Sequence, residues 1–193
     1  MSHENVAVRA KTGLLSVKNV VLIGMFGALA AVVMMIEFPL PMIAPAFYEL
    51  DLSEVPALVG TFAIGPAAGV MIEAVKILVK LLLKPTSTAY VGELANFCIG
   101  CTYLLLAGLL YMRNKSRKSA LTGMVAGTIV MAAAGCLVNA YILLPFYSGF
   151  YGMPLETLIG MGTAINPAIN SVLTFVVIAV VPFNIVKGIL ISA

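Results

Sequence analysis

Six apolar segments separated by turn signals run along this chain. They cover about residues 19–36, 53–64, 67–83, 90–112 and 120–144, and the last begins between residues 172 and 177. About 20 consecutive apolar residues are enough for a helix to cross the hydrocarbon core of a bilayer. The pattern therefore predicts an all-α integral membrane protein with six transmembrane helices, folded as a single domain over residues 1–193.

Prolines and glycines mark several boundaries between these segments. Gly65-Pro66 separates the second segment from the third, and Pro145 predicts the end of the fifth. Ser53 has the position and the side-chain chemistry of an N-cap for the second helix. In the glycine-rich and aromatic loop 145–172 we expect a short helix around Glu156.

Composition and charge agree with a membrane protein and orient it. Hydrophobic residues make up 62% of the chain and charged residues 10%. Basic residues gather in the N-terminal tail 1–17 and in the loop 113–118, and both regions are expected to face the cytoplasm. The loops 38–52, 84–89 and 145–172 are then extracellular, both termini are cytoplasmic, and the chain is embedded in lipid. Neither basic patch interleaves aromatic residues, so no nucleic-acid partner is expected.

The last apolar segment holds an asparagine and a lysine, Asn184 and Lys187, in the stretch "VVPFNIVKGI". A lysine near the centre of a membrane costs roughly 2.5–3.5 kcal/mol and needs a compensating partner, which we expect to be a ligand. Residues three apart share one helix face, and Pro182 just upstream disturbs the backbone. Because the chain stops six residues after Lys187 without a basic flank, we also expect this helix to be cut short.

Asn139, near the outer end of the fifth segment, is the matching polar residue. The three side chains of Asn139, Asn184 and Lys187 are predicted to converge on one pocket at outer depth. The alternative is that Lys187 extends to an interface and that the asparagines bond to neighbouring helices.

Two further patterns concern charge and helix packing. Glu73, Lys76 and Lys80 form one polar stripe at helical spacing, for which internal ion pairs or a groove lining are favoured over a proton relay. Glu93 and Asn96 repeat the i, i+3 arrangement in the fourth segment, either as pocket residues or as partners in hydrogen bonds between helices.

Three stretches together resemble a known family: "YELDLSEVPALVGTFAIGPAAGVMIEAVKILVKLL", "TSTAYVGELANFCIG" and "AVVPFNIVKG". They are similar to the riboflavin-specific substrate-binding subunits (S components) of energy-coupling factor (ECF) vitamin transporters, over about Val20 to Gly188. The resemblance implies a six-helix S-component bundle in a prokaryotic cell membrane. It would bind riboflavin, and FMN as a second candidate ligand, near the outer face. Delivery inward would use a shared transmembrane coupling subunit and two cytoplasmic ATPase subunits.

The resemblance also implies roles for particular residues. Asn139, Asn184 and Lys187 would contact the flavin, and the loop after the first helix would act as a lid. Candidate lid residues are Phe47, Tyr48, Glu49 and Leu50. The small-residue face of the first helix, which would meet the coupling subunit, consists of Gly24, Gly27, Ala28 and Ala31.

The chemistry of these residue types fits a flavin. The isoalloxazine ring is a flat apolar slab whose imide edge offers a donor between two acceptors, which an asparagine amide can complement. Lysine donates to carbonyl or ribityl oxygens, and Phe47, Tyr48 and Met42 can cover the ring.

Other classes remain open at this point. A membrane enzyme of lipid metabolism would need clustered acids, a histidine or a nucleophile, and the acids here are scattered. An S component for another vitamin is a closer alternative: cationic thiamine suits Lys187 poorly, whereas the carboxylate of biotin suits it. A structural subunit without a ligand is a third. No ATP-binding motif occurs, so energy would come from partner subunits, and neither metal nor cofactor is expected.

Overall fold

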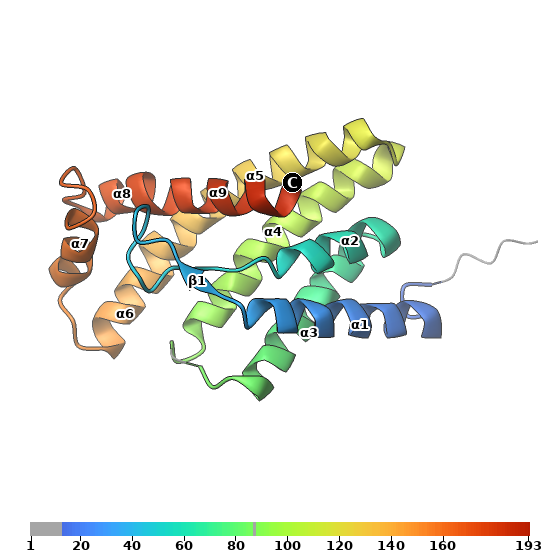
Figure 1. Ribbon diagram of the computed structural model, residues 1–193, viewed down its shortest axis with the longest axis horizontal. Coiled ribbons are helices and arrows are strands. Elements are labelled where there is room, and N and C mark those ends of the chain that lie inside the picture. Colours follow the sequence, from blue (N-terminus) through green and yellow to red (C-terminus); the bar gives the residue numbers. More distant parts are fainter. Residues whose placement is uncertain (1–12, 87) are drawn as a thin grey trace, which may run out of the picture.

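The computed structural model describes residues 13–86 and 88–193. Residues 1–12, most of the tail for which we predict a cytoplasmic location, lie outside the described part. The structure is mainly helical (Figure 1). Its elements are α1 (Val17–Met34), β1 (Phe38–Pro39), β2 (Glu49–Leu50), α2 (Glu54–Ile64), α3 (Pro66–Leu83), α4 (Val91–Asn114), α5 (Arg117–Val138), η1 (Asn139–Leu143), α6 (Leu144–Phe150), α7 (Leu155–Thr163), α8 (Val172–Phe175), η2 (Val176–Val180) and α9 (Val181–Ser192).

The predicted apolar segments correspond to these helices, with two differences in detail. Four helical spans in the described chain are long and apolar enough to cross a membrane: Val17–Met34, Val91–Asn114, Arg117–Phe150 and Val172–Ser192. Helix α2 has 11 residues and is too short by this measure. Helix α3 has 18 residues but carries three charged side chains.

The fifth helical span does not stop at Pro145 as the sequence predicts. A π-helical turn, η1, precedes the proline, and the helix continues as α6 to Phe150. Because Pro145 has no N–H and its ring crowds the preceding turn, an α-helix would be interrupted there. The wider π turn absorbs this defect. The equivalent turn η2 lies just before Pro182, so both prolines are accommodated in the same way.

The loop 38–52 contains a short antiparallel strand pair that the sequence analysis does not anticipate. Phe38 pairs with Leu50, and Pro39 pairs with Glu49. The pair brings the two ends of the loop together. The segment from Phe47 to Asp51 is thereby placed against the helices.

The short helix expected around Glu156 is also present, as α7.

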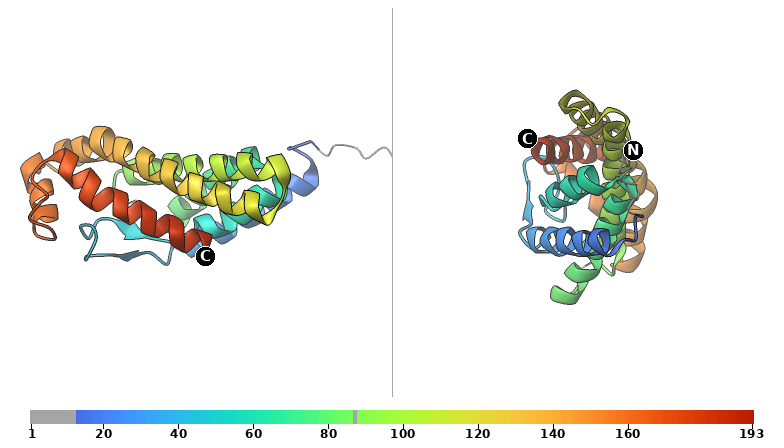
Figure 2. Two further views of the ribbon diagram at one scale, coloured as in Figure 1. Left: turned by 90° about the horizontal axis from the view of Figure 1, so that it is seen from above. Right: turned by 90° about the vertical axis from the view of Figure 1, so that its right-hand side faces the viewer.

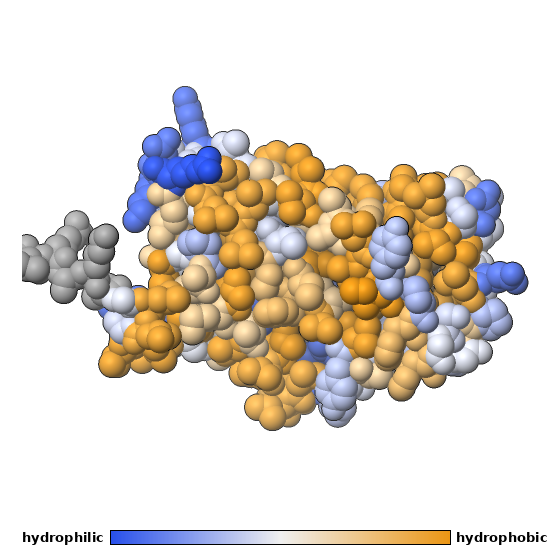
Figure 3. Space-filling model, turned by 180° about the vertical axis from the view of Figure 1, so that it is seen from behind, coloured by the Kyte–Doolittle hydropathy of each residue, from blue (hydrophilic) through white to orange (hydrophobic). Residues whose placement is uncertain are grey.

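The helices extend between two ends of an elongated molecule (Figure 2). Helices α4 and α5 lie side by side as a hairpin, α1 packs along α3, and α9 packs on α5. The connection between α4 and α5 lies at the same end as the start of α1, whereas α7 and α8 lie at the other end (Figure 1). Apolar side chains cover most of the face seen in Figure 3, and hydrophilic residues gather toward its two ends.

The interior contains two apolar clusters with polar residues between them. One includes Leu143, Tyr147 and Phe183, and it lies around α6–α9 and the loop 38–52. The other joins α1–α5 and the end of α9, and it includes Met131. Members of both clusters line the cavity described next, so the cavity lies where the two clusters meet.

Candidate functional site

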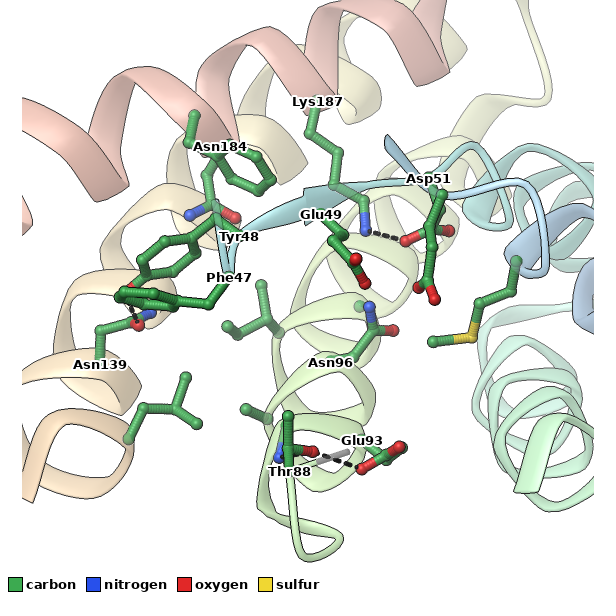
Figure 4. Close-up of a pocket in the computed structure, with 18 of the residues that line it drawn as sticks. Phe47, Tyr48, Glu49, Asp51, Thr88, Glu93, Asn96, Asn139, Asn184 and Lys187 are labelled. Atoms are coloured by element: carbon green, nitrogen blue, oxygen red, sulfur yellow. Dashed lines mark hydrogen bonds and ion pairs between the residues drawn. The ribbon is translucent and has the colours of Figure 1, made fainter. Parts of the chain in front are cut away.

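A cavity of about 150 Å³ lies between α4, α5–η1, α9 and the segment 47–54 (Figure 4). Its wall is partly apolar and partly charged. The polar and charged side chains that line it are Glu37, Tyr48, Glu49, Asp51, Glu54, Lys80, Lys84, Thr88, Glu93, Asn96, Asn139, Tyr147, Asn184 and Lys187.

The structure places Asn139, Asn184 and Lys187 together on the wall of this cavity (Figure 4). Asn139 begins η1, and Asn184 and Lys187 lie on one face of α9. All three are at most 6% exposed. The predicted convergence of these residues is therefore present in the fold.

The two asparagines are held by their own helices. Asn139 donates from Nδ2 to the carbonyl oxygen of Gly135 at 2.7 Å, and Asn184 donates from Nδ2 to that of Val180 at 2.9 Å. A Cβ atom added at Gly135 would lie 2.7 Å from Asn184 Nδ2. The absence of a side chain at Gly135 is what lets α5 and α9 approach closely enough to share the site.

Two aromatic residues of the loop 38–52, Phe47 and Tyr48, also line the cavity and lie next to Asn139 (Figure 4). Tyr48 donates a hydrogen bond to Asn139 Oδ1, and its ring centroid lies 5.7 Å from that of Phe183. Phe47 packs on Tyr48 with a centroid distance of 4.7 Å. Burial raises the pKa of the Tyr48 hydroxyl, so it remains a proton donor. The amide oxygen of Asn139 thus already accepts a hydrogen bond from Tyr48 in this structure.

Not every predicted loop residue reaches the cavity. Glu49 lines it, but Leu50 does not, because the side chain of Leu50 is fully buried in the neighbouring apolar cluster. Met42, expected to cover a ring, is 91% exposed. Glu49 and Leu50 are neighbours on β2, and successive side chains of a strand point to opposite faces. Leu50 therefore points away from the cavity that Glu49 lines.

Lys187 is paired with two carboxylates of the protein. Its Nζ lies 3.1 Å from Asp51 Oδ2 and 3.1 Å from Glu54 Oε1. The expectation that the compensating partner of Lys187 is a ligand is therefore wrong, because Asp51 and Glu54 are its partners. Burial disfavours the charged form of Asp51, but Lys187, Lys76 and a hydrogen bond from the Ser53 N–H outweigh this effect, so the pKa of Asp51 lies below its ordinary value.

A second lysine continues this charged cluster toward α3 and α4. Lys76 Nζ lies 3.3 Å from Glu54 Oε1 and donates to Ser53 Oγ and Asn96 Oδ1, each at 3.0 Å. It also pairs with Glu73 on its own helix. The predicted internal ion pair of α3 is confirmed. Ser53 is the N-cap residue of α2, as the sequence predicts, but its side chain makes no capping hydrogen bond and instead accepts from Lys76.

Lys80, the second lysine of the stripe on α3, ties α3 to the start of α4. Lys80 donates to Glu93 Oε1 at 2.6 Å, while Thr86 and Thr88 donate to Glu93 Oε2 at 2.9 and 2.8 Å. Glu93 and Asn96 therefore line the cavity and also bond to α3, so the two interpretations of their spacing hold together.

Two glutamates and a lysine lie at the edge of the cavity. Lys84 pairs with Glu37, which precedes β1. Partial desolvation at the edge of the cavity and the nearby Glu37 carboxylate raise the pKa of Glu49. The ion pair between Lys84 and Glu37 joins the end of α3 to the start of the strand pair.

The charges along the cavity have a clear sign. Five carboxylates and three lysines line it, namely Glu37, Glu49, Asp51, Glu54 and Glu93 with Lys80, Lys84 and Lys187. With all groups ionised the wall has two negative charges more than positive ones. Such a wall can hydrogen-bond a neutral polar molecule between aromatic rings, but it repels an anion.

Comparison with known proteins identifies the family. A family model described as the substrate-specific component of ECF transporters matches residues 18–193. This chain belongs to that family. It is an S component, a substrate-binding part of a transporter and not an enzyme.

Similar proteins support this assignment. A protein named riboflavin transporter RibU, from Staphylococcus aureus, is 36% identical over 184 residues, which are 95% of this chain and 89% of that protein. Riboflavin transporter FmnP of Bacillus subtilis is 30% identical over 92% of this chain and 88% of its own. A solved structure described as "Structure and mechanism of the S component of a bacterial ECF transporter" superposes with a TM-score of 0.71 at 36% identity, covering 91% of this chain and 89% of that one.

In this S component the small residues of α1 divide between two faces. Gly27 and Ala31 are buried, and a Cβ added at Gly27 would lie 2.4 Å from Val75 Cγ1 of α3. These two residues serve internal packing, contrary to the prediction that they meet a partner subunit. Gly24 and Ala28 are exposed, and a Cβ at Gly24 would have no atom within 4 Å.

Asp51 and Glu54 are among the lining residues that the sequence alone does not single out, as are Tyr147 and Phe183. Asp51 and Glu54 are acidic residues beside an apolar helix start, and both are nearly inaccessible in the fold. A charge that is buried in an apolar segment needs a partner of opposite sign. Acidic residues next to apolar segments are therefore candidate partners for Lys187, however far away they lie along the chain.

Proposed function

We propose that this chain is the riboflavin-binding S component of an ECF importer. The observation that carries the proposal is the convergence of Asn139, Asn184 and Lys187 on one cavity with aromatic walls. Two similar proteins, RibU of Staphylococcus aureus and FmnP of Bacillus subtilis, are named riboflavin transporters.

The shape and chemistry of the cavity suit a flat, neutral and polar ligand. Tyr48, Tyr147 and Phe183 offer apolar faces for the isoalloxazine ring. The amides of Asn139 and Asn184 complement the imide edge, and the Lys187 ammonium donates to a carbonyl or ribityl oxygen.

The loop 38–52 has to move for a ligand of this size. Sites for drug-sized molecules commonly have about 300–1,000 Å³, and the cavity here has about 150 Å³. Tyr48 occupies the Asn139 oxygen and would be displaced. We assign the segment 47–50 to the lid, with Leu50 anchoring it in the apolar core rather than touching the ligand.

Charge argues against the biotin alternative. The attraction of a carboxylate to Lys187 loses its force because Asp51 and Glu54 already neutralise this ammonium. FMN carries a phosphate and meets the same unfavourable wall, so we propose that it binds more weakly than riboflavin.

The membrane arrangement and the partners follow from the family. We propose six transmembrane helices, including the short α2 and the charged α3, with both termini and the loop 113–118 in the cytoplasm. A transmembrane coupling subunit would contact α1 at Gly24 and Ala28, and two cytoplasmic ATPase subunits would supply the energy. The common end shared by the start of α1 and the α4–α5 connection supports this orientation.

A riboflavin titration of the protein purified in detergent tests the proposal. Flavin fluorescence should be quenched saturably, and Asn184→Leu should lower the affinity about 10- to 100-fold, because a hydrogen bond lost in a buried site costs about 1–3 kcal/mol. Asn114→Leu, at an exposed asparagine at the end of α4, is the matched control and should bind normally. Wild-type protein that quenches no flavin would contradict the proposed function.

A further inference from the structure

Lys187 is held from two sides by acids that belong to a different part of the fold. Asp51 directly follows β2, and Glu54 begins α2, whereas Lys187 lies on the last helix. The ammonium is 3.1 Å from an oxygen of each carboxylate. Asp51 and Glu54 are 2% and 1% exposed, so little solvent screens these pairs.

Both carboxylates are themselves fixed. Asp51 Oδ1 accepts the backbone N–H of Ser53 at 2.8 Å, which leaves Oδ2 for Lys187. Glu54 Oε1 lies between two ammonium groups, at 3.3 Å from Lys76 and 3.1 Å from Lys187. The acids therefore present a rigid receptor for the end of a long side chain that otherwise has four rotatable bonds.

Stability alone does not account for this arrangement. A buried ion pair is often no more stable than well-packed apolar residues of similar volume. A lysine on an apolar helix could also extend toward an interface. Here it turns inward to the cavity wall beside Asn184, and the charge that it brings there is already balanced.

We infer that Asp51 and Glu54 are positioning residues for substrate binding: they fix the Lys187 ammonium at the cavity wall and cancel its charge, so that the site accepts a neutral polar ligand. The inference rests on the proposed riboflavin-binding function. It assigns to the β2–α2 connection a role that acts through Lys187 and requires no contact between the acids and the ligand.

A double-mutant cycle between Asp51 and Lys187 tests the inference, since a residue that acts through another loses its effect when that other residue is removed. Asp51→Asn should lower riboflavin affinity about 10-fold or more in the wild-type background. In the Lys187→Met background the same change should alter affinity less than about 3-fold. Equal losses in both backgrounds, or none in either, would overturn the inference.

Asp51→Asn removes a buried charge and can prevent folding, so a second pair of variants keeps every charge. Asp51→Glu and Glu54→Asp each move the carboxylate by one methylene group and preserve the charge balance. Positioning predicts about 10-fold weaker binding by a ligand-free protein that still unfolds cooperatively, whereas a role in charge balance alone predicts normal binding. Normal binding by both variants would overturn the inference.

The same measurements distinguish this inference from the proposed function. If the wild-type protein fails to bind riboflavin, the proposed function fails and the inference fails with it. If the wild-type protein binds riboflavin and the cycle shows no coupling, only the positioning role is lost.

Discussion

Lys76 illustrates how individual charged residues survive in an apolar interior. Its ammonium is fully buried and touches Glu54, Glu73, Ser53 and Asn96, so every donor has an acceptor nearby. Burying an ammonium is tolerated only when charges and hydrogen bonds compensate for the lost water. The lysine in turn neutralises acids on α2 and α3, and each group of the cluster depends on the others.

Replacing Lys76 by methionine should therefore destabilise the protein by about 3–5 kcal/mol, because Glu54 and Glu73 would lose a buried counter-charge. Thermal unfolding in detergent measures the effect. Lys118→Met, at an exposed lysine, should unfold within about 0.5 kcal/mol of wild type. Adding Glu73→Gln to Lys76→Met should recover part of the loss, and equal unfolding of the two single variants would contradict the prediction.

The raised pKa of Glu49 gives a pH dependence with a definite sign. The folded protein binds this proton more readily than the unfolded chain, whose glutamate has the ordinary pKa of 4.5. The penalty of the partly desolvated charge beside Glu37 is therefore present at neutral pH and is relieved as the pH falls through the raised pKa toward 4.5. Lys84 and Lys80 oppose the shift, and Glu37 reinforces it.

Wild-type protein should consequently gain stability relative to Glu49→Gln when the pH is lowered from 7.5 toward about 4.5. The measurement is the difference in unfolding temperature between the two proteins at each pH. Glu156→Gln, at an exposed glutamate of α7, serves as the control and should show no such trend. A difference that stays constant with pH would count against the assignment.

At the scale of helices, close approach between α5 and α9 builds the site. Gly135 makes room for Asn184, and Gly188 makes room for Thr128, whose Oγ1 is held by the carbonyl oxygen of Met124 at 2.9 Å. A Cβ at Gly188 would lie 2.4 Å from two atoms of Thr128. These close contacts help to bring Asn139 of η1 and Asn184 of α9 to one cavity.

Gly188→Ala should accordingly cost about 1–3 kcal/mol through overpacking, although alanine is the better helix former. Gly24→Ala, where a Cβ meets no atom within 4 Å, should be neutral or slightly stabilising in the isolated protein. Thermal unfolding compares the two variants. Restoring space with Thr128→Ala in the Gly188→Ala protein should recover stability, and a stable Gly188→Ala single variant would show that the helices can separate without cost.

Across the whole molecule, the surface and the charge distribution suit a bilayer. The apolar surface in Figure 3 lies between hydrophilic ends, and the basic α4–α5 connection is at one of them. Cytoplasmic loops of membrane proteins are enriched in lysine and arginine. We therefore expect the α4–α5 connection to face the cytoplasm, and labelling from either side of the membrane can measure this orientation.

Single cysteines test this orientation after the native Cys98, Cys101 and Cys136 have been replaced by alanine. A membrane-impermeant thiol reagent should label Glu156→Cys in intact cells. Lys118→Cys should react only in inverted vesicles, because its loop is expected to face the cytoplasm. The opposite labelling pattern would reverse the proposed topology.

Much of this architecture could be predicted from hydrophobic pattern because each transmembrane segment is a local feature. Asn139, Asn184 and Lys187 could be singled out for the same reason: each is polar in an apolar helix. What the pattern could not reveal is the continuation of the helix through Pro145, since the compensating π turn has no distinct residue signature.

The partners of Lys187 were missed for a different physical reason. Asp51 is 136 positions away along the chain, and no periodicity relates residues at such a distance. The same limit applies to the hydroxyl of Ser53: the local sequence correctly predicts the N-cap position, but not the hydrogen bond that this hydroxyl accepts from Lys76 of the next helix.

The separation of Lys187 from Asp51 also affects how the protein is made. During synthesis the loop 38–52 and α2 emerge before α9, and Asp51 lies 136 positions before Lys187, so Asp51 and Glu54 lack one of their cations until α9 has been made. A nascent chain that lacks α9 holds these acids without Lys187, in a setting where unpaired charge is costly. Formation of α9 thus completes the charge pairing of Asp51 and Glu54. Chains that lack α9 should be preferred substrates for membrane quality-control proteases.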